Sequence, residues 1–129
     1  MQLATTILVW AIIAHAIADW LLQNEWMAKN KTSLRHPAGY VHGLIYMICL
    51  MGVYPFWAAL IVSITHILID TRKPLQWWRR IFKRTPNAEE GSQISLGEDQ
   101  ALHLVILAVM AIIVSKYSNP SILLNFLGK

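Results

Sequence analysis

Four apolar runs separated by short polar loops constrain the fold of this chain more than any other feature. They cover residues 3–22, 39–53, 56–69 and 102–115, and between them they hold one carboxylate and no Lys or Arg. A helix rises about 1.5 Å per residue, so roughly 20 apolar residues cross a hydrocarbon core of about 30 Å. The first run has that length, and the others cross only with their polar end turns satisfied by neighbouring helices or in a locally thinned bilayer. We therefore predict an all-α fold, a polytopic membrane four-helix bundle forming one domain.

Two other interpretations of the apolar runs are disfavoured. The run from Leu3 to Ala14, followed by Ala16-Ile17-Ala18, resembles a signal peptide with its cleavage site, but no Lys or Arg precedes it. A single helix over residues 39–69 would have to contain Gly52 and Pro55 near its centre. We expect a retained first helix and a helical hairpin in the middle of the chain.

The charge distribution points to a membrane and gives a topology. Charged residues make up 14% of the chain, where an average soluble protein has about a quarter. Three Lys or Arg lie between the first two runs and six between the last two, against Lys116 and Lys129 on the other side. This pattern is typical of membrane-flanking loops and argues against nucleic acid as a partner. We predict a multi-pass membrane protein with both basic loops in the cytoplasm and both termini outside.

A short basic and aromatic segment, residues 74–84, is predicted to be an interfacial helix on the cytoplasmic side. Apolar side chains recur in it at helical spacing while Arg and Lys occupy the remaining face. Anchoring on anionic membrane lipid is the simpler role for these cations. The alternative is that they hold the phosphate of a substrate, and the candidate substrate-binding residues are then Arg79, Arg80, Lys83 and Arg84.

Ionisable residues at the ends of the apolar runs form a repeated pattern. Burying such groups in a membrane costs at least about 2.5 kcal/mol each, so their placement carries information. Two runs end with His-x-x-x-Asp, the last begins with the reversed Asp-x-x-x-His, and the second begins near a further histidine. Because successive helices alternate in direction, these groups should meet at the cytoplasmic end of the bundle in one depth order. They are His15, Asp19, His42, His66, Asp70, Asp99 and His103.

Imidazole and carboxylate ligands on helices suit a divalent first-row metal, with zinc expected first and manganese or iron as alternatives. Seven ligands exceed the need of one tetrahedral ion, so one or two ions per chain are expected, with Asp either bridging them or supporting the histidines. Asp99 or Glu98 is the candidate proton acceptor in catalysis. A single His-Asp pair is more often a structural hydrogen bond, and only the convergence of several favours a metal. His36 is expected to cap a helix or face solvent.

The motifs HAIADWLLQNEWMAKNK, HILIDTRK and DQALH, with His42 between the first two, resemble the small bacterial and phage membrane proteins of domain of unknown function family 3307. The resemblance runs from His15 to His103 and implies the same helical membrane fold, located in the inner membrane of a bacterial cell. The His-x-x-x-Asp pairs are more distantly similar to those of membrane-bound metal-dependent hydrolases. That similarity implies metal-dependent hydrolysis, with His15, Asp19, His66 and Asp70 as the best matching positions.

We therefore expect a metal-dependent membrane hydrolase that acts on a phosphoester or a lipid headgroup from the cytoplasmic leaflet. The first alternative is a protein that binds or transports a metal ion or protons. The second is a metal-stabilised membrane scaffold without catalysis. Transport would require polar residues that continue to the outer side, and the hairpin from Leu50 to Trp57 has no Asp, Glu, Lys, Arg or His. The sequence leaves open whether the chain forms a homo-oligomer.

The predicted topology can be tested with reporter fusions. A fusion at Lys129 should report the outer compartment and a fusion near Asn87 the cytoplasm, because the basic loops are retained inside. Two fusions that report the same side would contradict the topology and remove the argument that gathers the histidines at one end.

Overall fold

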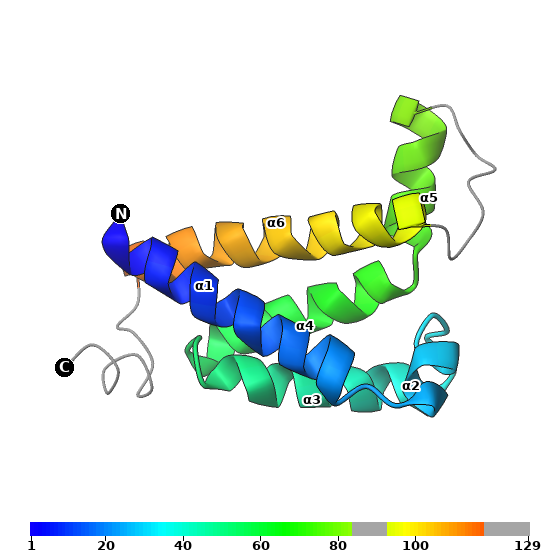
Figure 1. Ribbon diagram of the computed structural model, residues 1–129, viewed down its shortest axis with the longest axis horizontal. Helices are drawn as coiled ribbons and strands as arrows, with labels where there is room; N and C mark the ends of the chain where they lie inside the picture. The colour runs from blue at the N-terminus through cyan, green and yellow to red at the C-terminus, as the bar shows by residue number, and fades with distance from the viewer. Residues whose placement is uncertain (84–92, 118–129) are drawn as a thin grey trace.

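The computed structural model describes residues 1–83 and 93–117, and within these two ranges the regular structure is entirely helical (Figure 1). The elements are α1 (Gln2–Ala16), continued by the π-helical turn η1 (Ile17–Leu21), α2 (Glu25–Asn30), α3 (Pro37–Met51), α4 (Phe56–Asp70), α5 (Lys73–Trp78), continued by the π-helical turn η2 (Arg79–Lys83), and α6 (Gln93–Tyr117). The predicted all-α fold is confirmed. Arg84, the last residue of the predicted interfacial helix, lies outside the described residues.

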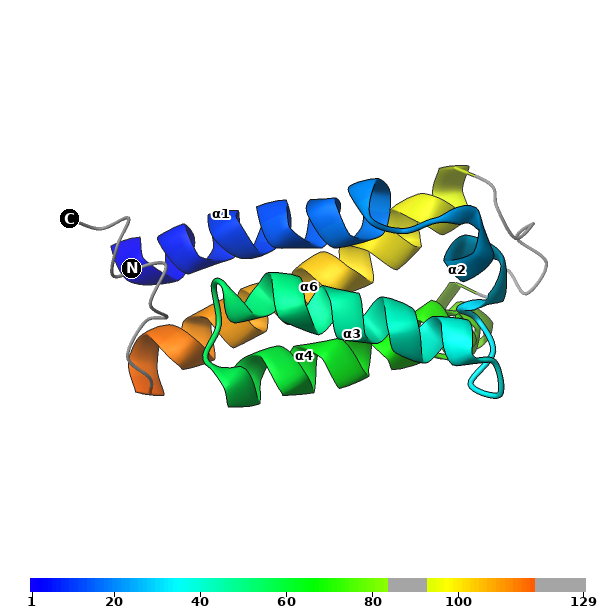
Figure 2. The same ribbon diagram turned by 90° about the horizontal axis from the view of Figure 1, so that it is seen from below.

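The long helices α1, α3, α4 and α6 lie alongside one another and alternate in direction (Figures 1 and 2). Helices α1 and α4 end, and α3 and α6 begin, at the end of the bundle that carries α2 and α5. Both basic loops therefore lie at one end of the bundle, opposite the N-terminus. Helix α5 leaves this end at a steep angle to α6, as Figure 1 shows.

Local sequence signals explain where α2 and α3 begin. Asn24 caps α2 by accepting a hydrogen bond from the backbone N–H of Met27 at 2.9 Å. His36 caps α3 in the same way, with Nδ1 accepting from the N–H of Ala38 at 3.2 Å. Pro37 follows in the first turn, where its missing N–H costs nothing. The expectation that His36 caps a helix is confirmed.

Helix α6 is longer than the apolar run that predicted it. It begins at Gln93 rather than near Leu102, so the polar segment that contains Glu98 and Asp99 forms its first turns. These residues remain helical because their side chains find polar partners inside the protein instead of requiring a loop. Sequence hydropathy alone could not reveal those partners, and this is why the apolar run understated the helix.

Two helical stretches, Gln2–Leu21 and Ser95–Tyr117, are long and apolar enough to cross a membrane by length and composition. Helices α3 and α4 have 15 residues each, which is shorter than the usual span. The outward faces of the long helices carry large apolar side chains, including Val9, Leu44, Ile64 and Val109. Such a surface is compatible with membrane association. The crossing of a membrane by all four long helices stays a prediction.

Small residues let the long helices pack closely. Ala11, Ala18, Ala58 and Ala59 are completely buried at the helix contacts. The tightest approach is at Gly43 of α3, where an added Cβ would lie 2.4 Å from Cδ1 of Ile67 on α4. The hydroxyl of Ser63 also donates a 2.5 Å hydrogen bond to the carbonyl of Gly43. The backbone of α3 at Gly43 therefore lies against the Ile67 side chain of α4, next to His42.

Replacing Gly43 with Leu should lower the free energy of unfolding by about 1 to 3 kcal/mol, the usual cost of overpacking, because the new side chain collides with Ile67. Thermal unfolding of the detergent-solubilised protein measures the change. Gly97→Leu is the matched control, because nothing lies within 4 Å of a Cβ at Gly97. Adding Ile67→Ala to Gly43→Ala should restore the space that the new Cβ needs. If Gly43→Leu loses no stability, α3 and α4 are farther apart at Gly43 than in this structure.

Candidate metal centre

All four long helices contribute a histidine to one buried cluster near the α2 and α5 end of the bundle. His15 comes from α1, His42 from α3, His66 from α4 and His103 from α6, and each is at most 3% exposed. Asp19, in the π-helical turn that continues α1, and Asp70, at the end of α4, lie among them and are at most 6% exposed. The i,i+4 pairs predicted from the sequence therefore do converge.

Four atoms of the cluster lie close together. The Nε2 atoms of His42 and His66 are 2.9 Å apart. Asp19 Oδ1 lies 3.0 Å from Nε2 of His42 and 3.4 Å from Nε2 of His66. Asp70 Oδ2 lies 3.5 and 3.2 Å from the same two nitrogens. Ligands bound tetrahedrally at 2.0 to 2.1 Å from zinc are about 3.3 Å from one another, so each carboxylate oxygen lies at a ligand-to-ligand distance from both nitrogens.

Hydrogen bonding among the side chains does not explain these short contacts fully. Asp19 Oδ1 and Asp70 Oδ2 are buried close to imidazole nitrogens without hydrogen-bond geometry, and Asp70 Oδ2 also lies 3.2 Å from the ammonium group of Lys31. A buried carboxylate oxygen without a partner costs several kcal/mol, so native proteins rarely leave one. Close approach without hydrogen-bond geometry is what donor atoms directed at a shared cation would show. Groups made of His42, His66 and Asp70, and of His15, Asp19 and His66, could hold a metal ion.

The other oxygen of each carboxylate faces the remaining two histidines. Asp19 Oδ2 lies 3.7 Å from His15 Nε2. Asp70 Oδ1 lies 3.7 Å from His103 Nε2. The two carboxylates thus stand between one histidine pair, His42 and His66, and a second pair, His15 and His103.

Tyr46 of α3 fixes the positions of two of the imidazoles. Its ring stacks on His66 with a centroid separation of 3.8 Å and an interplanar angle of 12°. Its hydroxyl lies 3.1 Å from Nδ1 of His15. Tyr46 is 1% exposed, so both contacts are made inside the bundle. A side chain that holds the far edge of a metal-binding imidazole sets its orientation and its tautomer.

The carboxylates of the cluster outnumber the cations that contact them. Asp19, Asp70 and Asp99 bring three negative charges, and Lys31 brings one positive charge, with its Nζ at 3.2 Å from Asp70 Oδ2. Buried charge of one sign is costly in a medium of low polarity. Among the described residues the balance would be restored by a divalent cation or by protons on the histidines.

A polar cavity of about 250 Å³ opens beside the carboxylates. Lys31 and Arg72 supply its positive charge, and the carboxylates of Asp19, Asp70 and Asp99 line it. Arg72 has a φ of 60°, the left-handed region that non-glycine residues seldom adopt. The cavity therefore joins the cluster to the end of the bundle that carries the basic loops.

The comparisons with known proteins place the chain in a family. Residues 7–126 match the family described as "Protein of unknown function (DUF3307)". The chain belongs to this family. No curated protein and no solved structure matches it. The family resemblance drawn from the motifs is therefore confirmed, and the matched range contains the whole cluster, while the more distant resemblance to metal-dependent hydrolases gains no support.

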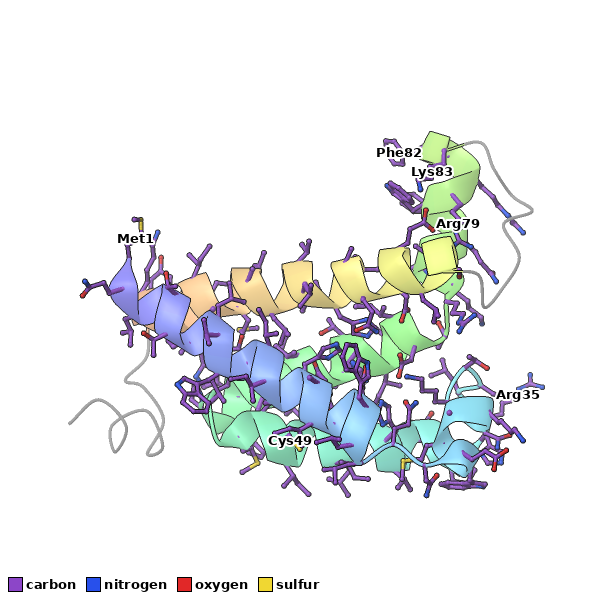
Figure 3. The ribbon with its side chains drawn as sticks, in the orientation of Figure 1. Met1, Arg35, Cys49, Arg79, Phe82 and Lys83 are labelled. Atoms are coloured by element: carbon purple, nitrogen blue, oxygen red, sulfur yellow. The ribbon has the colours of Figure 1, made fainter. Side chains whose placement is uncertain are left out.

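Three of the predicted substrate-binding cations, Arg79, Arg80 and Lys83, do not line the polar cavity. Arg79 is buried and its guanidinium pairs with Glu98 at 2.5 Å, and Lys83 pairs with the same carboxylate (Figure 3). Arg80 is exposed, and Arg84 lies outside the described residues. Glu98 is thus a bridge between η2 and α6 and does not line the polar cavity, so its role as a catalytic base stays a prediction without geometric support.

Sequence reasoning missed several residues of the site. Tyr46 was hidden in an apolar run, although its position four residues after His42 places it on the same helix face. Lys31 was counted only as a loop charge, and Arg72 only as part of a basic block. The left-handed backbone of Arg72 leaves no signal in the sequence. Gln100 also borders the cluster, with its Oε1 3.0 Å from His15 Nε2.

Proposed function

We propose that the protein is a membrane-embedded, metal-dependent hydrolase that acts on a phosphoester presented at the basic-loop end of the bundle. One observation carries this proposal: the Nε2 atoms of His42 and His66 lie 2.9 Å apart in the buried cluster, and one oxygen each of Asp19 and Asp70 lies 3.0 to 3.5 Å from both. Such a donor set suits zinc, with manganese and iron as alternatives.

The cavity beside the cluster supports a phosphate-containing substrate. Lys31 and Arg72 both line it, and an Arg can form paired hydrogen bonds with phosphate oxygens. A non-glycine residue kept in a left-handed conformation costs of order 1 kcal/mol or more, which favours a role for the Arg72 side chain. Lys31 also contacts Asp70, so a phosphate held by these cations would be close to the carboxylates of the cluster.

The residues around the cavity can be given roles in hydrolysis. A bound divalent ion would supply Lewis acidity and lower the pKa of water toward neutrality. Asp99 would accept the proton of the attacking water, because its Oδ1 is buried without a partner and the residue lines the cavity. The water oxygen forms a bond to phosphorus while the bond from phosphorus to the leaving oxygen breaks, and that oxygen takes the electron pair. Lys31 and Arg72 would hold the remaining phosphate oxygens.

The far end of the bundle favours a one-sided site over a transport path. Beyond the cluster the core is apolar, and Leu50, Val53, Leu107 and Val114 are at most 2% exposed there. Tyr54 is buried in the same region and donates its hydroxyl proton to the carbonyl of Leu107 at 2.8 Å. A proton or ion carrier would need polar groups in this region of the described bundle. The site therefore fits a reaction entered and left from one side of the membrane.

Metal binding is the first test of the proposal. Full-length protein purified in detergent and dialysed against zinc should retain about one ion per chain or more, and His66→Ala should lose most of it because His66 Nε2 contacts both carboxylates. His36→Ala is the control, since His36 caps α3 outside the cluster. Elemental analysis gives the ratio. A wild-type protein without metal in zinc-replete buffer would contradict the proposal.

Hydrolysis is the second test, measured with bis(p-nitrophenyl) phosphate and, separately, with phosphatidic acid in vesicles of neutral lipid. Asp99→Asn should lower kcat about 100-fold or more because the proton acceptor is lost. Arg72→Gly should raise KM with little change in kcat, because glycine accepts a φ of 60° without strain and only the guanidinium disappears.

Arg80→Ala is the matched control for the Arg72 variant, because Arg80 is an exposed cation of η2. It should leave KM unchanged for the soluble ester. If Arg80→Ala raises KM and Arg72→Gly does not, the phosphate is held by the interfacial segment and the cavity assignment is wrong. A metal-loaded protein that cleaves neither substrate would favour the non-catalytic alternatives.

A further inference from the structure

We propose that a second divalent cation binds between His15, His103 and the far oxygens of Asp19 and Asp70, so that both carboxylates bridge a pair of ions. The inference rests on the first ion of the proposed function, because the two ions share these carboxylates. It deepens that function by specifying a two-metal centre. The argument starts from His103, whose hydrogen bonding fixes the position of its proton.

His103 presents a bare nitrogen to a carboxylate. Its Nδ1 lies 2.8 Å from the backbone carbonyl oxygen of Asp99, one turn earlier in α6. A carbonyl can only accept, so Nδ1 carries the proton, and in the neutral ring Nε2 has a lone pair. That Nε2 is buried without a hydrogen-bond partner and faces Asp70 Oδ1 at 3.7 Å. Two electron-rich atoms thus face each other inside the protein.

His15 is placed in a comparable way on the other side of the cluster. Its Nε2 lies 3.0 Å from Oε1 of Gln100 and 3.7 Å from Oδ2 of Asp19. The amide group of Gln100 points its nitrogen toward Asp99 Oδ2 at 3.5 Å, which turns its oxygen toward His15. Gln100 Oε1 can only accept, so Nε2 of His15 donates its proton to it, and Nδ1 accepts from the Tyr46 hydroxyl at 3.1 Å. A bound ion would replace the Nε2 proton, and the neutral ring would then carry its proton on Nδ1, where the Tyr46 oxygen can accept it.

The two histidine rings lie close enough to share an ion. They stack with a centroid separation of 5.3 Å and an interplanar angle of 30°, so neither ring blocks the other from the carboxylates. Each carboxylate directs one oxygen to His42 and His66 and the other to one member of this pair, Asp19 to His15 and Asp70 to His103. A carboxylate whose two oxygens face different ligand groups is the usual bridge of a two-metal centre, in which the ions lie about 3.5 to 4 Å apart.

A proton is the competing explanation, and the distances argue against it. A charged N–H to carboxylate hydrogen bond is normally about 2.7 to 2.9 Å long. The two Nε2 to carboxylate contacts of His15 and His103 are both 3.7 Å. An ion with bonds of about 2 Å to each atom separates its ligands by roughly 3 to 4 Å, which spans that gap. The remaining negative charge of the cluster also favours a cation over neutral histidines.

The second site would receive the substrate from the polar cavity. Asp99 and Gln100, which contact His103 and His15, also line that cavity next to Lys31 and Arg72. Two ions so placed form a clamp for the attacking and leaving oxygens of a phosphoryl group. The chemical class of the substrate is then a phosphate ester whose phosphoryl group can reach both ions.

Manganese gives a readout that does not depend on activity. Metal-free full-length protein in detergent, loaded with Mn²⁺ and desalted, should hold two ions per chain by elemental analysis. Its low-temperature paramagnetic resonance spectrum should be that of a spin-coupled pair. His103→Gln should reduce the ratio to one and give the six-line spectrum of an isolated ion. His36→Gln, which leaves the cluster intact, should behave like the wild type.

The remaining outcomes would overturn the second site alone or both proposals. One ion in the wild type and in His103→Gln would overturn the second site and leave the proposed function standing, whereas no ion in either protein would overturn both. If His103→Gln does not fold, Gln100→Leu replaces it, since this variant removes one oxygen that faces His15. It should weaken the second ion about tenfold and leave the first unchanged. Two ions bound with wild-type affinity in Gln100→Leu and no spin coupling would also overturn the proposal.

Discussion

The burial of two carboxylates governs the architecture of this protein. Asp19 and Asp70 are at most 6% exposed, in the interior of a bundle whose outward faces are largely apolar. Isolated buried carboxylates would cost many kcal/mol and would instead take up protons or reject the fold. Here each long helix contributes an imidazole, and Lys31 approaches from the segment after α2. The alternation of helix direction brings these partners together, because it places the polar end of every helix at one end of the bundle.

Close packing of α3 against α4 brings two histidines of this cluster together. Gly43 allows α3 to approach α4 within van der Waals contact of Ile67, and His42 and His66 then come within 2.9 Å. The π-helical turn at Ile17–Leu21 changes the spacing of side chains just where Asp19 must reach across to His42. Such turns are rare and are frequently found at functional sites. The local distortion and the close helix contact are thus both explained by the convergence of ligands.

Much of this arrangement could be predicted from the sequence because it follows from two regular patterns of residues. The apolar runs predicted the helices, and the i,i+4 spacing of His and Asp, combined with alternating direction, predicted that the pairs meet at one end. Pair interactions between distant segments could not be read in the same way. Glu98 looked like a free carboxylate beside Asp99. In the fold, η2 lies close to the start of α6, and Glu98 pairs with Arg79 and Lys83 of η2. Arg72 and Lys31 looked like two members of basic blocks, and only the fold brings them to one cavity.

The asymmetry of the bundle limits what the cluster can do. Its charged groups, its polar cavity and both basic loops lie at one end, and Leu50, Val53 and Leu107 close the other. A device that moves ions across a membrane must let its site open to each side in turn, which requires polar surface toward both. A hydrolase needs access from one side and exclusion of bulk water from the other.

The steep angle of α5 to α6, with exposed Trp77 and Phe82 next to Lys83, fits a segment that lies along a membrane surface at the open end. A substrate with a phosphate group and an apolar tail would meet that surface before it met the cavity, and this ordering favours a lipid-linked phosphoester over a freely diffusing one.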